Sequence, residues 1–113
     1  MNLDASDDWK IGSAASNYTV DFWLKSTKSG SSYIIGTDEQ SIGARRGAWG
    51  MMRNNASEFA AWLRNNDNSS SFISLSLADS NSLFNGSWHH VAWVLNNNTF
   101  KLYVDGTEKG SVS

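Results

Sequence analysis

The stretch GSWHHVAWVLNNNTFKLYVDGT, residues 86–107, decides the fold. Every second residue is apolar before and after the run of three asparagines that begins at Asn96. These apolar residues are Val91, Trp93, Leu95, Phe100, Leu102 and Val104. A period of two is typical of β-strands, and asparagine tolerates the left-handed backbone of a hairpin turn. The stretch therefore predicts a β-hairpin, and Asp105-Gly106 predicts a second turn and one more strand through Val112.

The same alternation recurs in the rest of the chain, between clusters of Gly, Asn, Asp and Ser. It is found in residues 17–26, 31–36, 47–54, 57–65 and 70–79. In the last of these, Ile73, Leu75 and Leu77 alternate with serines, which predicts a half-buried strand through Leu77. Seven or eight short strands and no helix predict an all-β fold, an antiparallel β-sandwich. No repeat, linker or charge block divides the sequence, so we expect a single domain over residues 1–113.

The composition restricts the class of protein. The chain has 113 residues, of which 40% are hydrophobic, enough for one packed core. Its net charge of -2 supplies no basic surface for nucleic acid or anionic lipid. No run of about eighteen apolar residues crosses a membrane, and no signal peptide is visible. The absence of cysteine excludes disulfides, thiolate catalysis and cysteine-bound zinc.

Three segments carry a resemblance to a known family: YTVDFWLKS, GSWHHVAWV and FKLYVDGTEKGS. Together they resemble the laminin-G-like domains of the concanavalin A-like lectin/glucanase superfamily, and the resemblance runs across nearly the whole chain. It implies a jelly-roll sandwich of two curved antiparallel sheets that serves adhesion and binds sugars or proteins. It also implies an extracellular, cell-surface or virion-associated setting.

The sequence departs from that family at both ends. Family domains have a further strand before the first segment and closing strands after the last one. We therefore expect a shortened sandwich with open sheet edges. Because open edges pair with other chains, the sequence predicts self-association, as a homodimer.

The adjacent histidines His89 and His90 are one candidate for chemistry. Adjacent strand residues point to opposite faces of a sheet, so the pair is not expected to share a metal ion. We interpret both as hydrogen-bonded structural residues, with a pH-sensitive contact through His90 as the alternative. Calcium is a weaker alternative, because loop carboxylates bind it in some relatives. The acids concerned are Asp7, Asp8, Asp38 and Asp67, which are more typical of turn residues.

The carboxylates do not predict an enzyme. Glycoside hydrolases need two acids that flank the scissile bond, and no predicted strand holds two acids two or four residues apart. Glu58 and Glu108 each stand alone near turns. A Ser-His-Asp arrangement stays open because it is spatial, although no nucleophile-elbow motif is present.

Aromatic side chains are the remaining candidates. The alternation places Trp23, Trp62 and Tyr103 on the faces opposite the core, where His90 and Arg64 lie among them. Flat rings beside hydrogen-bonding groups suit sugars, and they suit protein interfaces equally. For Trp23, packing in a second layer is the favoured alternative, because the family motif places an aromatic there in members of diverse function. Trp9, Trp49 and Trp88 are expected to be packing anchors at strand ends.

These observations predict a non-enzymatic module, without a cofactor, that recognises carbohydrate or a glycosylated surface. The expected ligand-binding residues are Trp23, Trp62, Tyr103, His90 and Arg64. The alternative is a structural protein–protein module for assembly of a secreted, surface or phage virion protein.

Overall fold

The computed structural model describes residues 17–36, 49–54, 57–64 and 70–113, without the side chains of Arg64 and Ser70. These residues form eight strands and one helix. They are β1 (Asn17–Leu24), β2 (Ser32–Gly36), β3 (Trp49–Arg53), β4 (Phe59–Arg64), β5 (Ser70–Ser74), α2 (Leu77–Leu83), β6 (His89–Asn96), β7 (Thr99–Val104) and β8 (Thr107–Val112). The predicted all-β class is confirmed.

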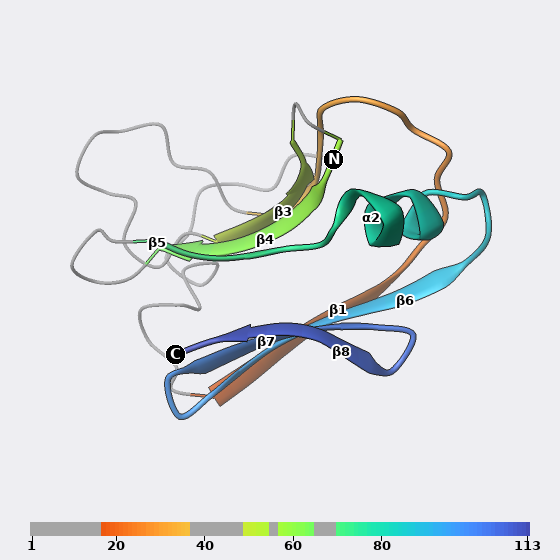
Figure 1. Cartoon of the computed structure of the whole chain (residues 1–113). Coiled ribbons are helices and arrows are strands. Elements are labelled where there is room, and N and C mark those ends of the chain that lie inside the picture. Colours follow the sequence, from red (N-terminus) through yellow and green to blue (C-terminus); the bar gives the residue numbers. More distant parts are fainter. Residues whose placement is uncertain (1–16, 37–48, 55–56, 65–69) are drawn as a thin grey trace, which may run out of the picture.

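The strands make two antiparallel sheets that face each other as two layers (Figure 1). Sheet A has the order β1-β6-β7-β8, and sheet B has the order β2-β3-β4-β5. The chain passes from sheet B to sheet A through α2, which lies at one end of the two layers (Figure 1). This arrangement is the predicted antiparallel β-sandwich.

Both predicted turns are present in sheet A. Asn97 and Asn98 have φ values of 46° and 65°, and Asp105 and Gly106 have φ values of 49° and 78°. Two consecutive residues with positive φ make the two-residue turn that matches the twist of a hairpin. The first turn pairs Leu95 with Phe100 in the register of β6 and β7. The second turn leads into β8, which ends at Val112 as predicted.

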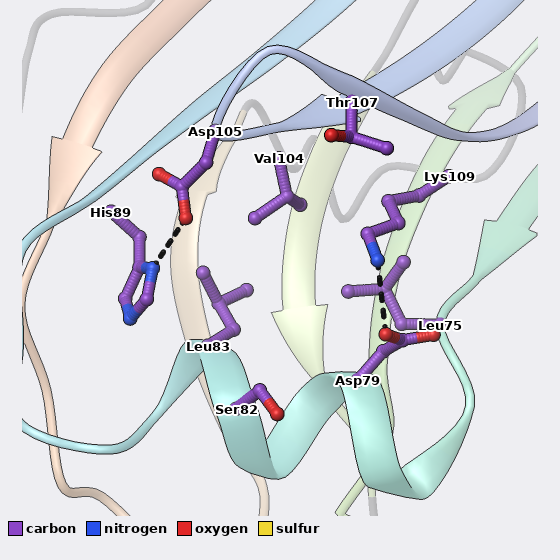
Figure 2. Close-up of a pocket in the computed structure, with 9 residues that line it drawn as sticks. All are labelled: Leu75, Asp79, Ser82, Leu83, His89, Val104, Asp105, Thr107 and Lys109. Carbon is purple, nitrogen blue, oxygen red and sulfur yellow. Dashed lines mark hydrogen bonds and ion pairs between the residues drawn. The ribbon is translucent and has the colours of Figure 1, made fainter.

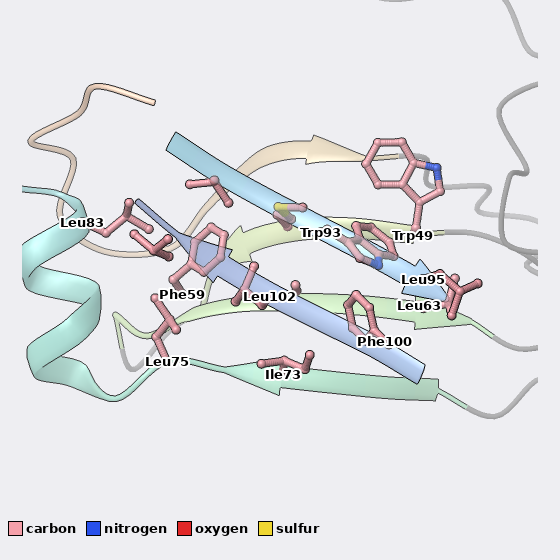
Figure 3. Close-up of a cluster of buried hydrophobic side chains, with 14 of the residues drawn as sticks. Trp49, Phe59, Leu63, Ile73, Leu75, Leu83, Trp93, Leu95, Phe100 and Leu102 are labelled. Atoms are coloured by element: carbon pink, nitrogen blue, oxygen red, sulfur yellow. The ribbon is translucent and has the colours of Figure 1, made fainter. Parts of the chain in front are cut away.

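The core lies between the sheets and is built from the predicted alternation (Figure 3). Trp93 is fully buried at its centre, with ring centroids 5.1 Å from Trp49 and 4.9 Å from Phe100 in edge-on geometry. Edge-on contacts between aromatic rings add to the stabilisation that burial provides. The prediction that Trp49 is a packing anchor is confirmed, whereas Trp9 lies outside the described residues.

The prediction of a strand through Leu77 and of no helix is wrong. β5 ends at Ser74, and α2 begins at Leu77, whose side chain is 49% exposed. The Oγ atom of Ser76 caps the helix by accepting a hydrogen bond of 3.1 Å from the backbone N–H of Asp79. Such a cap satisfies a helix N–H that has no partner within the helix. The apolar alternation continues past the strand: Leu75 is still buried in the core, whereas Leu77 already belongs to the helix and is exposed.

Along one side of the sandwich, β8 of sheet A approaches β5 of sheet B. A Cβ atom placed on Gly110 would lie 2.5 Å from the Cγ2 atom of Ile73. A glycine at this position therefore allows the two layers to come together where a larger residue would hold them apart.

A buried arginine ties the helix to the loops at the same end of the fold. Arg53, the last residue of β3, is only 4% exposed. Its Nε atom donates to the carbonyl of Ser57 at 2.8 Å, and its two terminal nitrogens donate to the carbonyl of Lys28 and to Oδ1 of Asn81, the latter at 2.9 Å. The guanidinium carbon lies 4.5 Å from the ring centroid of Phe84. One side chain thus positions three segments that are distant in sequence.

Candidate functional site

The outer face of sheet A, directed away from the core, combines aromatic and charged side chains. It presents Asp21, Trp23, His90, Lys101, Tyr103 and Glu108. In the strand register, Trp23 lies opposite His90, and Asp21 lies opposite Ala92. Ala92 in turn lies opposite Tyr103. The short side chain of Ala92 therefore separates the carboxylate of β1 from the phenol of β7.

On this face, Trp23 and His90 form the central pair. The indole of Trp23 is 64% exposed, and its centroid lies 5.3 Å from that of the His90 ring, with the planes tilted by 52°. His90 Nε2 is hydrogen-bonded to Asp21 Oδ2 at 2.8 Å. Because this bond fixes the imidazole, the indole has a rigid neighbour although most of its surface is open to solvent.

The neighbouring strands add a second polar group to the face. Lys101 Nζ donates to Glu108 Oε2 at 2.9 Å, and the hydroxyl of Tyr103 donates to the same oxygen at 3.5 Å. The hydrogen bond to Glu108 raises the pKa of the Lys101 ammonium group, which therefore stays charged. The face thus offers hydrogen-bond donors and acceptors on both sides of its aromatic rings.

The structure brings together three of the five expected ligand-binding residues: Trp23, His90 and Tyr103. Trp62 lies on the outer face of sheet B instead. A Cβ atom on Gly50 would come within 2.9 Å of its indole, and Trp62 pairs with Phe72 across the strands. Arg64 ends β4, and its side chain lies outside the described part. The five residues therefore do not share one surface, because β1 and β4 belong to different sheets.

Trp88 is an exposed residue that the sequence analysis placed wrongly. It was expected to anchor a strand end by packing, but its side chain is 62% exposed. Its ring lies 5.9 Å from the ammonium nitrogen of Lys25, the residue that follows β1. The sequence does contain a sign of this exposure. Trp88 lies two residues before His90, so a strand that continued to Trp88 would place both side chains on the same face.

A hollow lies between α2 and the turn that joins β7 and β8 (Figure 2). It encloses about 200 Å³. A hydrogen bond and an ion pair line it: His89 Nδ1 with Asp105 Oδ2 at 2.7 Å, and Lys109 Nζ with Asp79 Oδ1 at 3.0 Å (Figure 2). Leu75, Leu83 and Val104 supply its apolar wall.

The ionisable side chains in this hollow are hydrogen-bonded in pairs. The hydrogen bond from His89 and another from the backbone N–H of His90 lower the pKa of Asp105. The hydrogen bond from Lys109 lowers the pKa of Asp79 in the same way. Both carboxyl groups therefore stay ionised near neutral pH, so neither is suited to act as a general acid.

The hollow does not contain a Ser-His-Asp triad. His89 Nε2 is hydrogen-bonded to Asn85 Oδ1 at 3.0 Å, and the hydroxyl of Ser82 donates to the carbonyl of Ala78 at 3.1 Å. The serine and histidine are thus engaged with other partners. His89 and His90 point to opposite faces and are both hydrogen-bonded within the sheet, as the sequence predicts.

The described residues contain neither a cluster of metal ligands nor a membrane-spanning helix. In that part of the chain, no three His, Asp or Glu side chains gather around a point where a metal ion would fit. The expected calcium-binding candidates Asp7, Asp8, Asp38 and Asp67 lie outside it. None of the helical structure within residues 17–36, 49–54, 57–64 and 70–113 has the length and apolar character needed to span a bilayer.

Comparison with known proteins decides the family. A family model described as the concanavalin A-like lectin/glucanases superfamily matches residues 4–113. The chain belongs to this superfamily. The resemblance seen in the sequence is thereby confirmed. Among curated proteins, none matches this superfamily member.

One solved structure similar to this lectin-like chain is the binding domain of Paraclostridial Mosquitocidal Protein 1. The two share 20% sequence identity with a TM-score of 0.62. The match covers 87% of this chain and 25% of the other, so the chain spans about a quarter of that protein's length. At this level of identity the likeness shows a common fold.

Proposed function

We propose that this superfamily member is a non-enzymatic binding module that recognises carbohydrate through the outer face of sheet A. The observation that carries the proposal is the exposed indole of Trp23, set beside a His90 ring that Asp21 holds in place. An exposed aromatic ring costs free energy in water unless something covers it. A surface of this kind in a lectin-like fold supports a sugar as the ligand.

The chemistry of the face matches that of a sugar ring. A pyranose has an apolar C–H face, which packs on an indole, and a rim of hydroxyl groups. Asp21 and Glu108 accept hydrogen bonds from hydroxyls, and Lys101 donates to them. Because these side chains project from paired strands, they are held in place before the ligand arrives, which lowers the entropic cost of binding.

The charge state of the carboxyl groups supports binding over catalysis. Glycoside hydrolysis requires one acid whose raised pKa keeps it protonated. Among the described acids, those with a shifted pKa, Asp79 and Asp105, are shifted downward. A module of this type fits a secreted, cell-surface or virion protein.

A glycan array followed by titration calorimetry in solution tests the proposal. Trp23→Ala and Tyr103→Ala are expected to lower affinity for every sugar that the native chain binds. Leu77→Ala is the control, because Leu77 is 49% exposed at the start of α2, away from both outer faces. The proposal fails if no glycan binds, or if the Leu77 variant loses as much affinity as the Trp23 variant.

Self-association is a second candidate function, and the outer face of sheet B favours it. Tyr33, Ile35 and Phe72 are 66%, 38% and 57% exposed there, beside the partly covered Trp62 and Met52. Apolar faces of this kind commonly mark protein interfaces. The proposed occupant is a second copy of the chain, which would pair through this face, whereas the sequence predicts a homodimer through open sheet edges. Light scattering over a wide concentration range tests it: Phe72→Ser should yield a monomer, and a native monomer at every concentration refutes it.

A further inference from the structure

We propose that Trp88 and Lys25 form a second sugar-binding position next to Trp23, so that the ligand is a linear oligosaccharide chain and not a single terminal sugar. This inference rests on the proposed carbohydrate function of the outer face of sheet A. It assigns a binding role to a tryptophan that the sequence analysis had placed in the packing.

The first argument is that the alignment of β1 and β6 continues past the ends of both strands. The register pairs Trp23 with His90 and ends with Leu24 opposite His89. The next outward pair would be Lys25 and Trp88, and these two side chains are in contact, with 5.9 Å from the ammonium nitrogen to the ring centroid. Beyond them, the backbone N–H of Gly86 donates to the carbonyl of Ser26 at 3.0 Å.

This alignment makes Trp23 and Trp88 diagonal neighbours on the same outer face. Diagonal residues on neighbouring antiparallel strands have Cα atoms about 7–8 Å apart. Two indoles at this separation lie close enough for consecutive units of one sugar chain to contact both. A single sugar unit on Trp23 would leave the second indole uncovered.

The second argument is exposure. Trp23 and Trp88 are 64% and 62% exposed, whereas Trp49 and Trp93 in the core are 6% and 0% exposed. Tryptophan is enriched among the residues that dominate binding energy at interfaces. The exposure of both large rings at the same end of one sheet face therefore indicates a binding surface longer than one sugar unit.

The third argument is that Lys25 supplies polar recognition at the second position. Within the described residues no carboxylate pairs with its ammonium group, which lies over the Trp88 ring. A lysine has three N–H donors. One or more of them is free to donate to the hydroxyls of a sugar unit that stacks on Trp88. The second position thus repeats the combination of ring and polar group found at Trp23 and His90.

Length dependence of binding tests the inference. The probes are cello-, xylo- and chito-oligosaccharides, from the monosaccharide to the hexasaccharide, measured by titration calorimetry and, for the shortest, by NMR shift titration. For the native chain, affinity should rise with the number of linked units until both indoles are covered. Trp88→Ala should lower affinity for the longer oligosaccharides about tenfold, or about 1.4 kcal/mol, and leave monosaccharide binding unchanged. Trp23→Ala should weaken both, and Leu77→Ala, on α2, neither.

Several results would overturn the inference. If Trp88→Ala binds long oligosaccharides as well as the native chain does, the second position does not exist. If that variant weakens monosaccharide and oligosaccharide equally, the two indoles form one position. If the glycan array shows binding to terminal branched sugars alone and no linear probe binds, the inference fails while the proposed function stands. If no glycan binds at all, the proposed function fails with it.

Discussion

Replacing Arg53 by methionine is expected to destabilise the sandwich more than any substitution on its outer faces. Methionine keeps an unbranched side chain of moderate length and removes the guanidinium group. The carbonyls of Ser57 and Lys28 and the amide of Asn81 then lose a charged donor. Because these acceptors belong to two loops and to α2, the substitution should loosen that whole end of the fold.

The magnitude follows from the contacts. A hydrogen bond to a charged group contributes about 1.5–3 kcal/mol, and Arg53 makes three. The loss is offset because methionine does not carry a buried charge, whose desolvation is itself costly. We therefore expect the free energy of unfolding to fall by about 2–4 kcal/mol, which lowers Tm by about 8–16 °C in a domain of this size.

Urea denaturation followed by tryptophan fluorescence and circular dichroism measures this loss. Arg53→Lys is the matched control, because lysine keeps the charge but lacks the planar fork that reaches three acceptors. It should recover part of the lost stability. The reasoning is refuted if Arg53→Met unfolds with the same urea midpoint as the native chain, or if Arg53→Lys is as stable as the native chain.

Three further predictions concern other contacts. Gly110→Ala should lower the free energy of unfolding by about 1–3 kcal/mol, because the added Cβ atom clashes with Ile73. Ile73→Ala in the same chain should relieve part of that clash. Additive losses in a double-mutant cycle would contradict this contact. Ser80→Ala should lower the free energy of unfolding, measured by chemical denaturation, by about 1–3 kcal/mol. The reason is that the buried hydroxyl accepts a hydrogen bond of 2.8 Å from the backbone N–H of Phe59. An unchanged stability would show that this N–H finds another partner. Asp105→Asn should destabilise the chain at neutral pH and much less in acid. The folded-state pKa of Asp105 is lowered, so its contribution is complete above the unfolded-state pKa of about 3.9 and is lost as the pH falls through the lower folded value. Urea unfolding at neutral and acidic pH measures this, and an equal loss at both would refute it.

Local sequence was sufficient to locate the strands. The alternation in residues 86–107 predicted both the hairpin and its buried side, and the structure buries Val91, Trp93 and Leu102 completely. The turns were also local, because Asn97-Asn98 and Asp105-Gly106 adopt positive φ with little steric cost. The helix escaped prediction because its capping serine follows a strand whose apolar rhythm extends by chance to Leu77.

The candidate site was predictable only in part. Trp23, His90 and Tyr103 were placed on an outer face by alternation, and the strand register brings them together. Alternation predicts on which side of its sheet a residue lies, but not to which of the two sheets its strand belongs. It therefore could not show that Trp62 lies on a different sheet from these three residues. Trp88 was missed because it lies just outside β6, although the period of two that places His90 on the outer face also reaches Trp88.

The sequence by itself determined which side chains of each strand face the core and where the chain turns, because strand period and turn conformation depend on neighbouring residues. The tertiary structure alone decided which strands share a sheet and how close β8 comes to β5. It also decided which acceptors in the loops and in α2 the buried guanidinium of Arg53 reaches. These features depend on contacts between residues far apart in the chain. Local patterns carry no information about such contacts until both layers are in place.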